Sequence, residues 1–137
     1  MRLCPRHQYL GAACLADHRL AFTRRSVKTG TGVADILPAQ GQTVWGALYA
    51  IHDNELIRLD RKEGYDWAYT RIRQPVRLEA DHQQYGAIIY TVRHKEESEV
   101  PPSRRYLESV IAAAYERGLP SSYIEKLEVV IPAESRA

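Results

Sequence analysis

Apolar residues follow two different spacings along the chain, and the first of them predicts β-strands. In residues 10–25 apolar positions alternate with polar or small ones, and Gly11 and the Asp17-His18 pair interrupt the run, which predicts two short strands. The segments "VADIL" and "TVWGALYAI" predict two more strands, separated by a turn over residues 38–41. Because "TVWGALYAI" is apolar on both alternating faces, we expect it to form a central strand that is covered on both sides.

A short helix and a hairpin are predicted next. The capping residues His52, Asp53 and Asn54 start a helix that runs to about Lys62, and Gly64 is its natural end. Strands are then predicted over residues 68–78 and 85–92, joined by the polar loop "EADHQQ". Pro75 lacks a backbone N–H, so it places the first of these strands near an edge or a bulge.

The spacing changes to a helical one after Pro101-Pro102. Ser103 is suited to cap a helix that ends at Gly118, and its apolar stripe consists of Leu107, Val110, Ile111 and Ala114. A second helix is predicted from near Ser122, because Ser122 and Glu125 have the spacing of a capping box. Strands first and helices last predict an α+β domain built around a curled, mostly antiparallel sheet with flanking helices.

Length and composition indicate one globular domain, residues 1–137, with 45% hydrophobic and 26% charged residues. No apolar run approaches the roughly 20 residues of a membrane span, and the chain does not start with a signal peptide, so we expect a cytoplasmic protein without membrane contact. The formal net charge is only +2, which does not favour a nucleic-acid partner.

The sequence contains no pattern that is typical of a metal or cofactor site. The five histidines show neither i, i+4 pairing nor grouping with cysteines, and "KTGTG" lacks the spacing of a phosphate-binding loop. A nucleophile elbow of the G-x-S-x-G type is also missing. We therefore expect neither a metal nor a cofactor, and we expect both cysteines to be reduced thiols.

Glu63 is the most informative polar residue of the chain. Leu56, Leu59 and Glu63 have the spacing i, i+3, i+7, which places them on one face of a helix, and the leucines predict that this face is buried. Burial and the negative end of the helix dipole both favour the protonated carboxyl, as suits a group that acts first as a base and then as an acid. Alternatively, Glu63 is exposed at a frayed helix end and pairs with Arg58 or Lys62, and the spacing leaves both interpretations open.

Three longer segments carry a resemblance to a known family. In order and spacing, "VWGALYAI", "LIRLDRKEGYDWAY" and "VPPSRRYLESVIAAAYERGLPSSYIEKL" resemble the γ-glutamylcyclotransferase family, and "RLAFTRRS" and "GVADILP" fit its bacterial members. The likeness extends from about Cys4 to Val130. It implies a small β-barrel with flanking helices around a cavity that holds the γ-glutamyl part of a peptide or amine.

The resemblance also implies roles for particular residues. Glu63, before the glycine of "KEGY", matches the family's catalytic acid and base, which helps the substrate's α-amino group attack its own γ-carbonyl and release 5-oxoproline. Tyr106, after "PPSRR", and Tyr69, after "GYDWA", match substrate-contacting tyrosines of the pocket, with simple ring packing as the alternative. The implied partner is a small γ-glutamyl compound, and no cofactor is implied.

The chain departs from the family at its start. Family members begin with a strand and a tyrosine-glycine-serine-asparagine loop that binds substrate, whereas this chain opens in a segment that resembles the helix after that loop. We therefore expect a domain that is N-terminally truncated relative to the family, and Met1 to be internal. A strand edge left without a neighbour would favour a homodimer. Two alternative functions stay open. The chain is either a catalytically inactive relative that acts as a binding or interaction module, or an enzyme for γ-glutamyl-amines.

Overall fold

The protein folds into one antiparallel sheet with helices packed against it. The computed structural model describes residues 7–63 and 68–135, apart from the Glu63 side chain. The elements in chain order are β1 (Gln8–Arg25), β2 (Gly32–Ala50), α1 (Asp53–Glu63), β3 (Tyr69–Leu78), β4 (Gln84–Val92), α2 (Arg104–Glu116), α3 (Ser121–Glu128) and a short 3-10 turn (Ala133–Ser135). Among the described residues, no helix has the length and apolar character that a membrane span requires.

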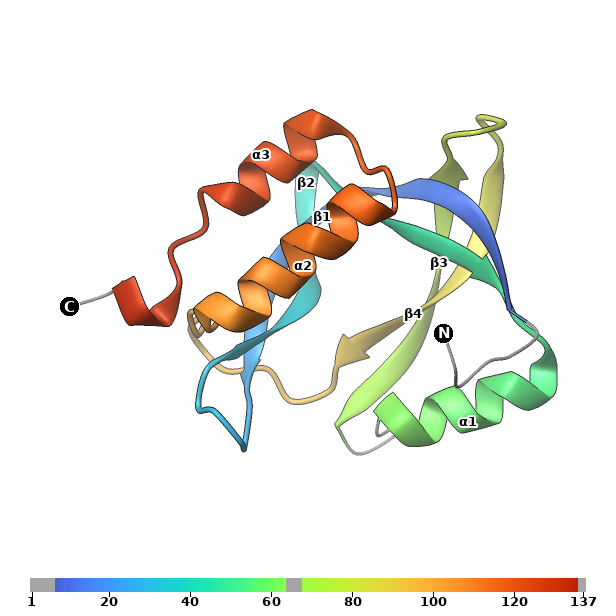
Figure 1. Cartoon of the computed structure of the whole chain (residues 1–137). Helices are drawn as coiled ribbons and strands as arrows, with labels where there is room; N and C mark the ends of the chain where they lie inside the picture. Colours follow the sequence, from blue (N-terminus) through green and yellow to red (C-terminus); the bar gives the residue numbers. More distant parts are fainter. Residues whose placement is uncertain (1–6, 64–67, 136–137) are drawn as a thin grey trace.

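The strand order is β2-β1-β3-β4, and every pairing is antiparallel. The sheet curls strongly, with α2 and α3 over β1 and β2 and with α1 beside β3 and β4 (Figure 1). The predicted α+β class with a curled antiparallel sheet is thus confirmed. The barrel is not, because no backbone pairing joins β4 to β2 within the described residues.

β1 and β2 are long strands, and each unites segments that the sequence pattern predicts as separate. The pairing shifts at Asp17, which has a positive φ of 59°, so that Ala16 pairs with Thr43 but His18 pairs with Pro38. Residues 39–42 consequently form a bulge at the predicted turn. Its residue Gly41, at φ 82°, donates its amide N–H to Asp17 Oδ1 at 3.0 Å. The prediction of separate strands is wrong because a bulge bends a strand without ending its pairing on either side.

β2 lies at one edge of the sheet, so the prediction of a central strand for "TVWGALYAI" is wrong. Both of its faces are nevertheless covered, as the pattern indicates. Val44 and Leu48 pack against the sheet's own apolar core, which includes Leu15, and Trp45 packs against the cluster that α2 and α3 form. An apolar pattern reports which faces are buried, and it does not report whether both backbone edges are paired.

The hairpin of β3 and β4 follows the prediction closely. The two strands pair from Tyr69 with Val92 to Arg77 with Gln84, around the predicted polar loop. Within the described residues, β3 pairs with β1 only near Leu78, and Pro75 has a strand neighbour on the β4 side alone, which suits its missing N–H.

The predicted start of α1 and the predicted cap of α2 are confirmed, whereas the predicted cap of α3 is wrong. At the start of α1, the buried carboxylate of Glu55 accepts the His52 amide N–H at 3.0 Å. This is one of the two hydrogen bonds of a capping box, the one to the side chain three residues along. Ser103 caps α2 by accepting the Tyr106 amide at 3.1 Å. The capping box predicted at the start of α3 is wrong, because Pro120 occupies the N-cap position and no side chain in the described part of the chain caps this helix.

Candidate active site

A pocket opens between β2 and β4, where the curled sheet does not close. One part has a volume of about 310 Å³ and an apolar floor that includes Ala13, Leu15 and Val76. A second part of about 390 Å³ extends toward α1. The two parts share the wall residues Ala47, Leu48, Ala87, Ile88 and Tyr90, so we treat them as one cavity, the interstrand pocket.

Helix α1 forms one wall of the interstrand pocket. Leu56 and Leu59 both line it, which confirms the inward face that the sequence predicts for these two residues. Glu63 is the last residue of α1, and its side chain lies outside the described residues, as does Gly64. The structure therefore does not test the third member of the predicted stripe.

A polar network ties α1 to the neighbouring hairpin. The Tyr90 hydroxyl, on a strand of the pocket wall, donates to the Asp60 carboxylate, and Arg71 Nη1 lies 3.5 Å from the other oxygen of Asp60. The contacts hold the C-terminal half of α1 against β3 and β4. Sequence reasoning missed this network, although a tyrosine inside an apolar strand signals a hydroxyl that needs a partner.

Neither of the two predicted substrate tyrosines is among the described residues that line the interstrand pocket. The Tyr106 hydroxyl accepts the Ala34 amide N–H at 3.0 Å and so connects α2 to β2. The Tyr69 ring, at the start of β3, lies 5.8 Å from the Arg24 guanidinium carbon. Neither tyrosine is among the described residues that line the pocket with Leu56 and Leu59, and their substrate-binding roles stay predictions.

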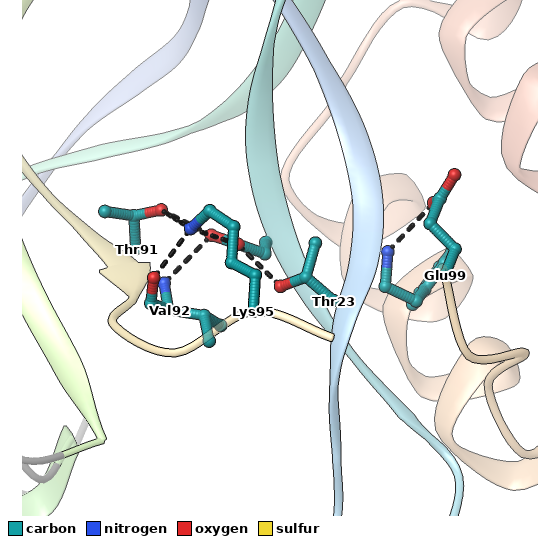
Figure 2. Close-up of polar contacts among 7 residues, drawn as sticks. Thr23, Thr91, Val92, Lys95 and Glu99 are labelled. Atoms are coloured by element: carbon teal, nitrogen blue, oxygen red, sulfur yellow. Dashed lines mark hydrogen bonds and ion pairs between the residues drawn. The ribbon is translucent and has the colours of Figure 1, made fainter. Parts of the chain in front are cut away.

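A buried carboxylate joins the two strands that backbone pairing leaves apart. Asp35, on β2, is 5% exposed and accepts the hydroxyls of Thr23 and Thr91, both at 2.6 Å, and the Val92 amide at 3.1 Å. Lys95 Nζ forms an ion pair with it at 2.8 Å. Figure 2 shows Thr23 of β1 facing Thr91 and Lys95, which come from the end of β4 and the loop that follows it. Because Thr91 and Val92 end β4, these bonds hold β4 near β2 beside the interstrand pocket.

The charge state of Asp35 follows from these partners. Burial alone would raise the pKa of this carboxyl above its ordinary value of 3.8, but hydrogen bonds from Lys95, Thr23 and Thr91 outweigh burial and hold the pKa below that value. Among the described residues, every buried side-chain nitrogen and oxygen has a hydrogen-bond partner. We therefore assign the cluster a structural role, as a support for the pocket.

Residues 43–127 match the model of the AIG2-like family. This segment is more than half of the chain. The protein belongs to the AIG2-like family.

The chain is also similar to individual proteins named γ-glutamylcyclotransferase. The bovine protein (Bos taurus) is 29% identical over 135 residues, which are 93% of this chain and 69% of the relative, and the human protein (Homo sapiens) is 29% identical over 133 residues with the same coverage. A solved structure of a γ-glutamyl cyclotransferase superimposes with a TM-score of 0.88 at 26% identity, covering 99% of this chain and 82% of that one. The family resemblance that the sequence predicts is thereby confirmed.

Proposed function

We propose that this protein is a γ-glutamylcyclotransferase, which releases 5-oxoproline from a γ-glutamyl peptide or amine. The observation that carries the proposal is that the family match covers the walls of the interstrand pocket. Residues 43–127 include the second half of β2, all of α1 and the β3–β4 hairpin. Relatives named for this activity therefore resemble the chain in the part that forms the pocket.

The reaction needs little machinery, because the nucleophile belongs to the substrate. The α-amino nitrogen attacks the γ-carbonyl carbon and forms the ring C–N bond, and the tetrahedral oxyanion then collapses and breaks the bond to the leaving nitrogen. One proton must leave the attacking nitrogen and one must reach the leaving nitrogen. The protein has to hold the reactive conformer, move this proton and stabilise the oxyanion.

Glu63 is our proposed acid and base for both proton steps. Its support is the helical spacing, since Leu56 and Leu59 line the pocket and Glu63 follows at the next position of the same stripe. The network of Asp60 with Tyr90 and Arg71 secures the part of α1 that leads to it. Tyr106 and Tyr69 remain proposed substrate-binding residues on the strength of the sequence resemblance.

The test is an assay of 5-oxoproline release from a panel of γ-glutamyl dipeptides and γ-glutamyl amines. We expect 5-oxoproline from at least one member, and no product when the α-amino group of the same substrate is acetylated, because acetylation removes the nucleophile. Release of glutamate in place of 5-oxoproline would indicate hydrolysis and contradict the proposal. A panel without any product would instead favour the inactive relative that binds a partner.

We further propose that two copies associate through their strand edges. Along the interstrand pocket, β2 and β4 each have one backbone edge without a strand partner in the described residues, and such edges favour pairing with another chain. Light scattering with size-exclusion chromatography should give at least twice the 15.6 kDa of one chain. A monomer at every concentration would mean that these edges are covered in another way.

A further inference from the structure

A second hollow lies between β2 and the two C-terminal helices, and we call it the helix groove. It has a volume of about 270 Å³. Its walls are mainly apolar side chains of β1, β2, α2, α3 and the turn between the helices, among them Leu20, Trp45, Val110, Ala113, Leu119 and Leu127. Within the described part of the chain, Arg117 is the one charged residue of the lining. The groove thus combines apolar walls with a single cation.

The helix groove is open to solvent along β2. Ala47 of β2 and Ala113 of α2, one on each wall, are both exposed. A Cβ atom on Gly46, which also lines the groove, would meet no atom within 4 Å beyond its chain neighbours among the described residues. Neither wall therefore carries a large side chain at these positions, and a small molecule can enter between them.

Two tyrosine rings hold the Arg117 side chain in place. Its guanidinium carbon lies 5.2 Å from the centroid of the Tyr9 ring and 5.6 Å from that of the Tyr49 ring. The Arg117 carbonyl oxygen also accepts the Tyr9 hydroxyl at 2.8 Å, which connects the end of α2 to β1. Because ring faces attract the charge but take up few of its N–H donors, these contacts orient the guanidinium without satisfying its hydrogen bonds.

The donors of Arg117 have no protein partner in the described residues, where the guanidinium forms neither an ion pair nor a hydrogen bond. Arg19 and Arg71, by contrast, are paired with acidic side chains. The other polar side chain of the groove is also engaged, since the Tyr123 hydroxyl is hydrogen-bonded to the Trp45 backbone. Arg117 is therefore the group of the helix groove that is available to a ligand.

An apolar groove with one guanidinium is complementary to a small molecule that has an apolar body and one carboxylate. The guanidinium can form two parallel, charge-assisted hydrogen bonds with a carboxylate, and the apolar walls can bury the rest of the molecule. An amine would be repelled by Arg117, and a neutral apolar molecule would cover its donors without replacing the water that they lose. At the packing density of protein interiors, 270 Å³ holds roughly a dozen non-hydrogen atoms, which suits a small acid.

We infer that the helix groove is a binding site for a small carboxylic acid with an apolar body, and that Arg117 binds its carboxylate. The site requires neither the proposed reaction nor any residue proposed for it, so either proposal can fail alone.

Isothermal titration calorimetry with two ligands of matched shape, 4-phenylbutanoate and 4-phenylbutan-1-ol, tests this site. For the wild type, we expect a dissociation constant about ten- to a hundredfold lower for the acid, the ordinary effect of a hydrogen bond to a charged group. Arg117→Gln should remove this difference by weakening binding of the acid alone. Arg117→Lys should keep part of it, because lysine retains the charge without the planar fork of donors. Ala113→Leu, which fills the groove but leaves Arg117 in place, should weaken binding of both ligands.

Arg105→Gln is the matched control, because Arg105 is an exposed arginine of the same helix and is not among the described residues that line the groove. It should leave both dissociation constants unchanged. Circular dichroism and urea midpoints should show that the variants fold, and Arg117→Lys and Ala113→Leu still test the site if Arg117→Gln does not. Equal wild-type affinity for acid and alcohol, an unchanged preference in Arg117→Gln, unchanged binding in Ala113→Leu, or no heat of binding with either ligand would each overturn it.

Discussion

Glu63→Gln should lower kcat for 5-oxoproline release by about 10²- to 10⁴-fold, the usual contribution of a general acid-base group. Glutamine keeps the size and much of the hydrogen bonding of glutamate, but it neither takes up nor delivers a proton at neutral pH. KM should change little, because the loss concerns the proton steps and not substrate binding. Initial rates of 5-oxoproline release, measured by chromatography over a range of substrate concentrations, separate the two constants.

Glu125→Gln is the matched control for this variant. Glu125 is an exposed glutamate on α3 and is not among the described residues that line the interstrand pocket. Its replacement by glutamine should therefore leave kcat and KM unchanged. A Glu63→Gln protein that folds normally and keeps more than about a tenth of wild-type kcat would contradict the acid-base role, since the expected loss is much larger. The alternative of an exposed Glu63 paired with Arg58 or Lys62 would then be favoured.

Asp35→Ala should lower the free energy of unfolding by about 3 kcal/mol, near the lower end of the cost of breaking a buried ion pair. The substitution removes the acceptor of Thr23, Thr91 and the Val92 amide, and it leaves Lys95 without its counter-ion. The Lys95 side chain is 32% exposed and can turn to water, which limits the loss. Urea unfolding followed by circular dichroism measures the difference.

Asp81→Ala is a suitable control for this stability measurement. Asp81 also accepts a tyrosine hydroxyl, that of Tyr85, and a backbone amide, that of Gln83, but it is exposed. Its removal should therefore have a much smaller effect on unfolding. An equal loss in both variants would contradict the view that the buried carboxylate holds β4 beside β2.

The stabilisation by Asp35 should also depend on pH, in a direction that follows from its lowered pKa. A carboxyl whose pKa is lower in the folded state stabilises the fold fully above the unfolded-state value of 3.8, and the stabilisation is lost as the pH falls through the folded-state value. The difference in unfolding free energy between wild type and Asp35→Ala should therefore be constant from pH 7 to pH 5. It should shrink below 3.8, and a difference that stays constant at acid pH would contradict the charged state of Asp35.

Local spacing is enough to predict much of this fold and one face of its pocket. The limits of α1, the Ser103 cap of α2 and the polar hairpin loop before β4 depend on residues that are close in sequence. The same holds for Leu56 and Leu59, because the helical period alone places both on one face. Helical spacing also pointed to Glu63 as an acid-base group, but it left a surface position open, and the roles of the two tyrosines came from the family resemblance alone. The matches confirm that resemblance at the level of the family.

The remaining features depend on contacts between distant segments, and local spacing carries no information about them. Whether the breaks at Asp17 and Gly41 end strands or bend them depends on how β1 and β2 pair as a whole. Asp35 receives its partners from β4 only because the sheet curls, and Tyr90 reaches Asp60 only after α1 packs against β3 and β4. An alternating or helical pattern specifies which faces become buried, while long-range packing selects which residues meet across the pocket.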